Sequence, residues 1–424
     1  MITTKSPRHQ KLGRRAACRW AGGQWESFLS AYLPICLLPA LCLCALVVDP
    51  LGLAQEASIT PYAAINHDTV TYNGPGREAD HDLAGSEIRV GLLLPLTGPR
   101  QAEGEALQRA AQLAVDDANA ARLPASPRLA LVTRDESGPW GQASAQIVHL
   151  IFEDQAVALI TSAEGGSAHL AEQVGNKIGV PILTLSSDTT TTEINLPWIF
   201  RLGPTDAAQA QAFTRDIYLN RKLQRVVLLS QDDHDGRLGG AEFIKAANAM
   251  NAVAPTQIVV DPEQFTETTS RKELSSAQAV VIWTDAPTAS GLVEKVRELQ
   301  PTAPLYLCRK AAEGDASVAI QLHGATCGNK DANSWIAAAP ESLQARTDFC
   351  RHYHQRFGAD PGIGAAEAYD AVRILAASLR QSGPNRARLR DALATVSAFA
   401  GASGIISFDH AGNDTSQVTL LKLR

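Results

Sequence analysis

From residue 88 onward, short apolar runs alternate with longer segments of helical periodicity, and this alternation restricts the possible folds more than any other feature. Residues 88–96 (IRVGLLLPL) form a near-continuous apolar run, which is typical of a strand buried on both faces. Residues 104–121 then place leucine, alanine and valine side chains at helical spacing. Strands that alternate with helices of this length predict βαβ units, in which helices cover both faces of a parallel sheet.

The alternation continues through most of the chain and predicts two lobes. Further strands are expected at 129–133, 157–161, 180–185, 225–230, 257–260, 279–284, 304–308, 404–408 and 418–423. Further helices are expected at 141–153, 167–178, 207–219, 239–250, 289–299, 312–322, 342–358, 364–382 and 386–396. About ten strands are too many for one core. We therefore expect an α/β protein with two doubly wound parallel-sheet lobes and a boundary near Gly203-Pro204. The three successive helices before the last strands indicate that the chain returns to both lobes.

Composition and charge exclude several classes of protein. Hydrophobic residues make up 45% of the 424 residues and charged residues 19%, which excludes a largely disordered chain. The net charge of −6 gives no reason to expect a nucleic-acid-binding protein. A single apolar stretch near the N-terminus could approach a membrane, so a polytopic membrane protein is also excluded.

The N-terminal segment has the features of a secretory signal. A basic region, residues 1–32, precedes the uncharged run 33–48, and Gly52-Leu53-Ala54 offers small residues before Gln55. Residues 1–54 are therefore expected to be a signal peptide, and an uncleaved membrane anchor through 33–48 is the alternative. Residues 55–87 lack periodicity and are interpreted as a linker, either a tether or a disordered leader.

Export also determines whether the cysteines can form a disulfide. Beyond residue 54 the chain keeps Cys308, Cys327 and Cys350, and an oxidising compartment allows one disulfide among them. Cys308 and Cys327 flank one predicted helix, so this pair is favoured over the other two pairings.

Five segments together resemble a known family. They are 90–99 (VGLLLPLTGP) with Glu103-Gly104 and a helix that ends near Asp117-Ala118-Asn119, then 179–182 (GVPI), Phe200-Arg201, 368–372 (AYDAV), and 404–409 (GIISFD) with Gly412-Asn413. In order and spacing they resemble the leucine/isoleucine/valine-binding group of type I periplasmic substrate-binding proteins, over residues 88–424.

The resemblance implies a fold and a role. Its members have two α/β lobes joined by a three-strand hinge, and they hold a ligand in the cleft between the lobes. By this resemblance, lobe 1 comprises residues 88–203 and 333–398, and lobe 2 comprises residues 204–332 and 399–424. The implied function is capture of an amino acid or organic acid and its delivery to the membrane subunits of an ABC transporter. The chain is then a periplasmic monomer, and no metal, cofactor or nucleic acid is implied.

Two loops of the first lobe are candidate binding sites. Glu164, Gly165, Gly166 and Ser167 follow strand 157–161 and open a helix, whose N-terminus favours an anion; the family's corresponding loop binds the ligand carboxylate. A plain N-cap turn around Ser167 is the alternative. Ser186 and Asp188 follow the next strand. Asp188 could hold a ligand ammonium or cap the polar turn that follows it, and both interpretations stay open.

The second lobe departs from the family pattern. Asp235 stands where the family commonly has a tyrosine, and Asp285 follows the next strand without the usual aromatic residue. Arg309 and Lys310 stand where amino-acid binders usually supply an acid. Because an unpaired buried charge costs several kcal/mol, this exchange predicts an anionic ligand. The alternative is that both side chains extend outward as a solvated edge.

Other functions are less well supported. The chain has no phosphate-binding loop, nucleophile elbow or His-Glu-x-x-His motif, so no enzymatic activity is expected. His169 is expected to lie on a helix, and the run 232–235 (DDHD) is expected to be a solvated loop because consecutive residues rarely converge on one ion. A membrane-tethered ligand sensor with the same fold remains the alternative function.

The signal segment gives a first testable prediction. Protein recovered from outside the cytoplasm should begin near Gln55, because signal peptidase cleaves after small residues. N-terminal sequencing of the exported chain checks this, and a chain that still carries residues 33–48 would instead indicate the uncleaved anchor.

Overall fold

The computed structural model describes residues 72–122, 126–139, 141–194, 196–261, 267–312, 334–338, 343–362, 364–416 and 418–423. The predicted signal segment, most of the predicted linker, the helix expected at 312–322 and Cys327 lie outside these residues, apart from the first residue of that helix. Cys308 is buried, and it forms no disulfide with another described residue. Because Cys327 is not described, its predicted pairing with Cys308 stays a prediction.

The first lobe is built on a five-stranded sheet in which every neighbouring pair is parallel. Its order is β2-β1-β3-β4-β5. The strands are β1 (Glu87–Leu94), β2 (Arg128–Asp135), β3 (Ala158–Thr161), β4 (Ile182–Thr184) and β5 (Ile199–Arg201). All five strands are therefore oriented alike, and their carboxyl ends meet at one edge of the sheet.

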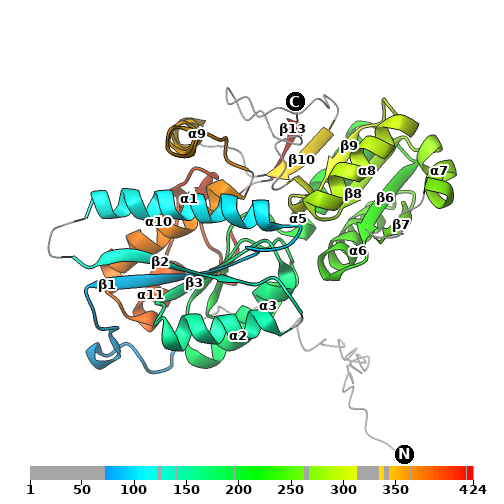
Figure 1. Ribbon diagram of the computed structural model, residues 1–424. Helices are drawn as coiled ribbons and strands as arrows, with labels where there is room; N and C mark the ends of the chain where they lie inside the picture. The colour runs from blue at the N-terminus through cyan, green and yellow to red at the C-terminus, as the bar shows by residue number, and fades with distance from the viewer. Residues whose placement is uncertain are drawn as a thin grey trace, which may run out of the picture. The chain divides into compact units, whose positions relative to one another are not determined.

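Helices cover both faces of this sheet, which explains the apolar run in β1. Leu92 and Leu94 pack with α1 (Gln101–Ala120) and α10 (Ala365–Ser382), and Leu93 packs with α2 (Gln142–Val148) and α3 (Gly165–Ile178) on the opposite face (Figure 1). Because consecutive strand residues point to opposite faces, a sheet covered on both sides needs apolar side chains at every position. Two further helices, α9 (Leu343–Phe357) and α11 (Arg386–Ala394), join the core on the side of α1 and α10.

The second lobe has a six-stranded sheet in the order β13-β10-β9-β8-β6-β7. Its strands are β6 (Val226–Gln231), β7 (Thr256–Val260), β8 (Ala279–Trp283), β9 (Leu305–Leu307), β10 (Ser334–Ala338) and β13 (Thr419–Leu423). Only the pair β10 and β13 is antiparallel among these described strands. Its core includes α5 (Asp206–Thr214), α6 (His234–Ala249), α7 (Glu267–Ser276) and α8 (Ala286–Leu299). The predicted pair of parallel-sheet lobes is confirmed.

The structure corrects two of the predicted lobe boundaries. Residues 334–338 form β10, which pairs with β9 in the second sheet, so the return to the first lobe follows this strand rather than beginning at 333. Residues 399–408 include the small hairpin β11 (Phe399–Ala400) and β12 (Ile405–Ile406). Ile406 and Phe408 lie in the first lobe's core, so only the end of the range 399–424 joins the second sheet.

The predicted linker is also too long at its C-terminal end. Arg77 donates to Asp391 on α11 at 2.7 Å, and Arg388 donates to Asp82 at 2.7 Å. Leu83 packs against the first lobe's core, and the ring of Tyr72 lies against Trp198. From Tyr72 onward the chain is therefore part of the first lobe, because it gains ion pairs and apolar contacts there.

Local structure differs from the sequence expectations in several elements. α2 and α5 continue as π-helical segments, His149–Glu153 and Arg215–Asn220, so the expected helices 141–153 and 207–219 have nearly the predicted extents. The short helix α4 (Thr190–Glu193) and α7 were not expected. Within the described part of the chain, no helix is long and apolar enough to cross a bilayer.

Asp370 on α10 fixes the turn between β11 and β12. Its side chain is fully buried and accepts hydrogen bonds from the amides of Ala402 and Ser403 at 2.9 and 2.7 Å. Asp370→Ala should lower the free energy of unfolding by about 3 kcal/mol, because it leaves buried donors without an acceptor. Urea denaturation measures this. Asp348→Ala, at a half-exposed position of α9, is the matched control, and an equal loss in both variants would contradict the assigned role.

Candidate functional site

Loops at the carboxyl edge of the first sheet surround a cavity of about 680 Å³. Its walls come from residues 95–100 after β1, residues 136–139 and Gly141 after β2, and the start of α3 after β3. Asp285, which precedes α8 in the second lobe, completes the lining. Ligands of open α/β sheets bind beyond the carboxyl ends of the strands, and this volume suits a small organic molecule.

Arg100 lies in the cavity wall among three carboxylates. Its guanidinium donates to Glu103 at 2.7 Å and to Glu164 at 2.5 Å, and it lies 4.0 Å from Glu136. Burial alone would lower the pKa of Arg100, but Glu103, Glu164 and Glu136 raise that pKa well above its ordinary value. Arg100 is thus a permanent cation of the site, although the sequence analysis did not identify it.

Glu136 is a buried acid that also lines the cavity. Its Oε1 accepts a hydrogen bond from Ser162 at 2.5 Å, whereas its Oε2 finds no hydrogen-bond partner among the described residues. Burial raises the pKa of Glu136 from its ordinary 4.5 to about 8, although Arg100 opposes the shift. At neutral pH this side chain is therefore largely protonated and can donate a hydrogen bond.

The first turn of α3 contains the predicted carboxylate-binding loop. Glu164 is the N-cap residue and makes no side-chain cap, so the alternative of a capping turn around Ser167 is wrong. The Gly165 amide donates to Asp235 of the second lobe at 3.2 Å, and the close carboxylates of Asp235 and Asp188 leave no room for a Cβ at this position. Gly166 and Ser167 line the cavity. First-turn amides have no acceptor within their own helix, so they can bind a ligand anion.

Lys310 is paired inside the protein and does not face an anionic ligand. Its Nζ lies 2.9 Å from Glu164 Oε2 and 2.5 Å from Asp235 Oδ2, and its side chain is 7% exposed. Burial would lower the pKa of Lys310, but the two carboxylates raise it well above its ordinary value. Burial would likewise raise the pKa of Glu164, and Lys310 with Arg100 lowers it to about 2. Asp235 therefore joins the lobes through Lys310 and Gly165.

Arg309 lies at the crossover between the lobes. Its guanidinium forms an ion pair with Glu367 on α10 at 3.0 Å and packs against Gly203, whose φ of +86° and lack of a Cβ admit it there. It does not line the cavity. The sequence argument for an anionic ligand rested on Arg309 and Lys310 as unpaired cations, and this premise is wrong because carboxylates neutralise both. Neither extends outward as a solvated edge, since both are buried.

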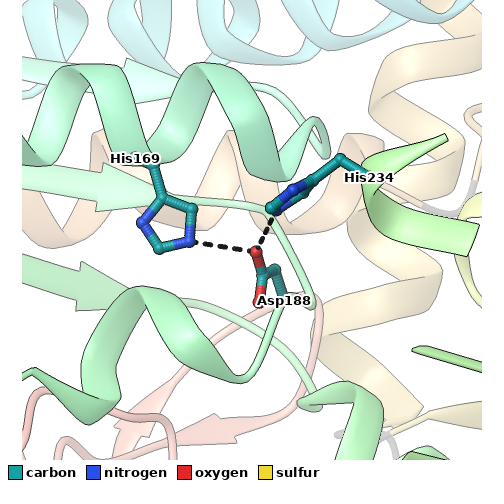
Figure 2. A group of neighbouring side chains, drawn as sticks. All are labelled: His169, Asp188 and His234. Atoms are coloured by element: carbon teal, nitrogen blue, oxygen red, sulfur yellow. Dashed lines mark hydrogen bonds and ion pairs between the residues drawn. The ribbon is translucent and has the colours of Figure 1, made fainter. Parts of the chain in front are cut away.

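The Asp188 carboxylate is hydrogen-bonded to two histidine side chains, at the position where a ligand ammonium group was one of the two predicted partners (Figure 2). Nε2 of His169 on α3 lies 3.1 Å from Asp188 Oδ2, and Nε2 of His234 at the start of α6 lies 2.8 Å from the same oxygen. Asp188 Oδ1 accepts from the Thr190 amide at 2.9 Å, so this residue also caps the polar turn, as one of the two open interpretations held. Ser186 is buried, and its Oγ accepts from the Asp188 amide at 3.2 Å.

The histidines and carboxylates of this cluster stabilise one another's charged forms. Hydrogen bonds to Asp188 and Glu172 raise the pKa of His169 from 6.5 to about 9, and Asp188 raises the pKa of His234. Burial would raise the pKa of Asp188, but the histidines and Thr190 lower it well below its ordinary range. Sequence reasoning placed His169 on a helix and His234 in a solvated loop; the signal that could have found them is their position just after the ends of two strands.

The predicted site residues therefore fall into two groups. Those that line the cavity are Glu164, Gly166, Ser167 and Asp285. Those that join the lobes or support the loops are Gly165, Ser186, Asp188, Asp235, Arg309 and Lys310. The cavity residues that sequence reasoning missed include Arg100 and Glu136, which follow strands β1 and β2, both correctly located. Arg100 lies directly after the family segment 90–99.

Comparisons with known proteins agree with this architecture. A family model described as "Periplasmic binding protein" matches residues 87–421. A Leu/Ile/Val-binding protein, BraC3, from Rhizobium johnstonii is 24% identical over 79% of this chain and 91% of its own. An amino acid binding protein from Pseudomonas aeruginosa is 26% identical over 53% of this chain, and the match spans 60% of that relative's length.

Solved structures share the fold. A leucine-binding protein from Thermotoga maritima has a TM-score of 0.70 at 17% identity, covering 80% of this chain and 95% of its own. A solute-binding protein of an ABC transporter from R. palustris, solved with benzoate, has a TM-score of 0.70 at 20% identity, covering 80% and 93%. These proteins are described as binding proteins rather than enzymes, in agreement with the sequence expectation.

Burial of Glu136 predicts a specific pH dependence. The folded state keeps the Glu136 proton up to about pH 8, whereas the unfolded chain releases it near 4.5, so this group's contribution to stability is lost as pH rises between these values. Glu136→Gln removes the effect. The variant's unfolding free energy should approach that of wild type near pH 4.5 and exceed it by up to about 5 kcal/mol above pH 8, at about 1.4 kcal/mol per pKa unit.

Urea denaturation at a series of pH values measures the difference between the two proteins. Glu105→Gln, at an exposed position of α1, is the matched control and should show no such trend. A difference between Glu136→Gln and wild type that stays constant with pH would contradict the buried, protonated state of Glu136.

Proposed function

Because this chain belongs to the periplasmic binding protein family, as its sequence predicts, we propose that it is an exported solute-binding protein that delivers a small ligand to an ABC transporter. The observation that carries the proposal is the 680 Å³ cavity at the carboxyl edge of the first sheet, which Asp285 of the second lobe completes. A ligand there touches both lobes. Its binding energy can therefore favour the closed arrangement, in the manner of a hinge.

The charges around the cavity support an amino acid as the ligand. Among the described residues that line it, Arg100 is the single cation, and the carboxylates of Glu103 and Glu164 already pair with it. An acidic ligand would therefore meet no unneutralised cation. A zwitterion fits better, since its carboxylate can accept from Ser167 and the first-turn amides of α3, and its ammonium can pair with Asp285.

The remaining walls set the size and polarity of the ligand side chain. Pro95, Pro99, Pro139 and Leu170 give the cavity apolar surface, whereas protonated Glu136 offers a hydrogen-bond donor beside them. This combination suits an amino acid with a modest apolar or weakly polar side chain. Organic acids without an ammonium group are the competing class.

Thermal unfolding of ligand-free protein against a panel of amino acids and organic acids tests the proposal. At a hundredfold excess over Kd a true ligand stabilises the fold by about 2.7 kcal/mol, which raises Tm by a few degrees. Ser167→Ala should weaken amino-acid binding about tenfold or more, because hydrogen bonds to a charged group contribute about 1.5–3 kcal/mol. Isothermal titration measures the affinity.

Ser275→Ala on α7 is the matched control, since this exposed serine does not line the cavity and its hydroxyl donates to the Lys272 carbonyl within its own helix. It should bind like wild type. Tighter binding of dicarboxylates than of any amino acid would contradict the zwitterion, and no stabilisation by either class would contradict the assignment of the cavity.

A further inference from the structure

We propose that His169, His234 and Asp188 form a binding site for a transition-metal ion of the Zn²⁺ type, and that the ion joins the two lobes. The candidate metal-binding atoms are the two histidine Nε2 atoms and Asp188 Oδ2, and all three lie within 4.8 Å of one another. Figure 2 shows both imidazole rings directed at the same carboxylate oxygen. The inference does not depend on which solute occupies the cavity.

The set of donor atoms selects the class of ion. Two imidazole nitrogens and one carboxylate oxygen are a typical protein environment for Zn²⁺, and three protein ligands leave one position open in a four-coordinate site. Hard ions such as Mg²⁺ and Ca²⁺ prefer oxygen donors throughout. The side chain of His234 is 42% exposed and that of His169 is 25% exposed, so solvent can reach the fourth position.

Neighbouring residues already orient these atoms. His169 Nδ1 lies 3.0 Å from Glu172 Oε2, and the Glu172 side chain is only 1% exposed. Metal-binding histidines commonly bond a carboxylate through the other ring nitrogen, which directs the remaining lone pair toward the ion. Asp188 is held equally well, because the amide and hydroxyl of Thr190 bind its Oδ1 at 2.9 and 2.7 Å and leave Oδ2 for the histidines.

An ion requires a defined rearrangement of the three donor atoms in this cluster. The Nε2–Oδ2 distances of 2.8 and 3.1 Å are hydrogen-bond lengths. Around a tetrahedral ion with bonds of about 2.0–2.1 Å, neighbouring donor atoms lie roughly 3.3 Å apart. Each Nε2 must therefore move away from Oδ2 by a few tenths of an ångström, and the two Nε2 atoms, which lie within 4.8 Å of each other, must come to the same separation. The Nε2 protons must leave as the ion enters. His234 is half-exposed at the first residue of α6 and can make this movement.

The site connects elements of different lobes. His169 on α3 and Asp188 after β4 belong to the first lobe, whereas His234 begins α6 in the second lobe. All three donors are together only when the lobes are closed, so the ion stabilises the closed arrangement. By linkage, the same ion must raise the affinity for any solute that also requires closure.

Cobalt(II) titration of the purified full chain, freed of metal by chelation and of any affinity tag, tests the site. Four-coordinate Co²⁺ gives intense visible absorption, so wild type should develop this spectrum with one equivalent of metal, and Zn²⁺ should displace it. His234→Ala should weaken binding at least 100-fold. Glu172→Gln, which alters a positioning residue, should weaken it by about 10–100-fold while the spectrum is retained.

His354→Ala is the matched control, because His354 is an exposed histidine that lies 2.9 Å from Asp360 and should not contribute. Small-angle scattering then tests the connection of the lobes, since Zn²⁺ should reduce the radius of gyration of wild type but not of His234→Ala. The absence of a four-coordinate Co²⁺ spectrum would overturn the proposal. So would binding that His234→Ala leaves unchanged, or that His354→Ala weakens equally.

Discussion

A lysine ammonium buried between two carboxylates holds the two lobes together, and the arrangement of the site depends on it. Lys310, which follows β9, lies 2.9 Å from Glu164 of the first lobe and 2.5 Å from Asp235 of the second. Because a buried charge without a partner costs several kcal/mol, the loops after β3, β6 and β9 must meet wherever Lys310 is buried. Arg100 extends the same network from Glu164 to the wall of the cavity.

This network determines which groups remain for a solute. Lys310 after β9 binds Asp235 at the start of α6, and Arg309 binds Glu367 on α10. The surface that faces the cavity is therefore provided mainly by Arg100, Glu136 and the first turn of α3 in the first lobe, together with Asp285 of the second. Glu136 is neutral there because its burial outweighs the nearby guanidinium. The cleft therefore combines helix-terminal donors with a protonated acid and few unneutralised charges, an environment that suits a neutral zwitterion.

The described contacts between the lobes that involve these residues are all polar or charged: Lys310 with Glu164, Gly165 with Asp235, His234 with Asp188, and Arg309 with Glu367. Charged groups regain water when such an interface opens, so its separation costs less than exposure of an apolar surface of equal area. This is the property that reversible closure requires. The apolar cores of the lobes are separate clusters, so each lobe can remain intact while the other moves.

The sequence by itself determined the alternation of strands and helices, the two lobes and the family, because apolar periodicity and turn residues are local properties. It also located the loops after β3, β4, β6, β8 and β9. Only the tertiary structure decided what those loops do. Arg309 and Lys310 carry the same charge in any sequence reading, but whether a charge faces a solute or a protein carboxylate depends on distances between residues far apart in the chain. His169, Asp188 and His234 meet for the same reason: folding brings the ends of strands from two lobes to one place.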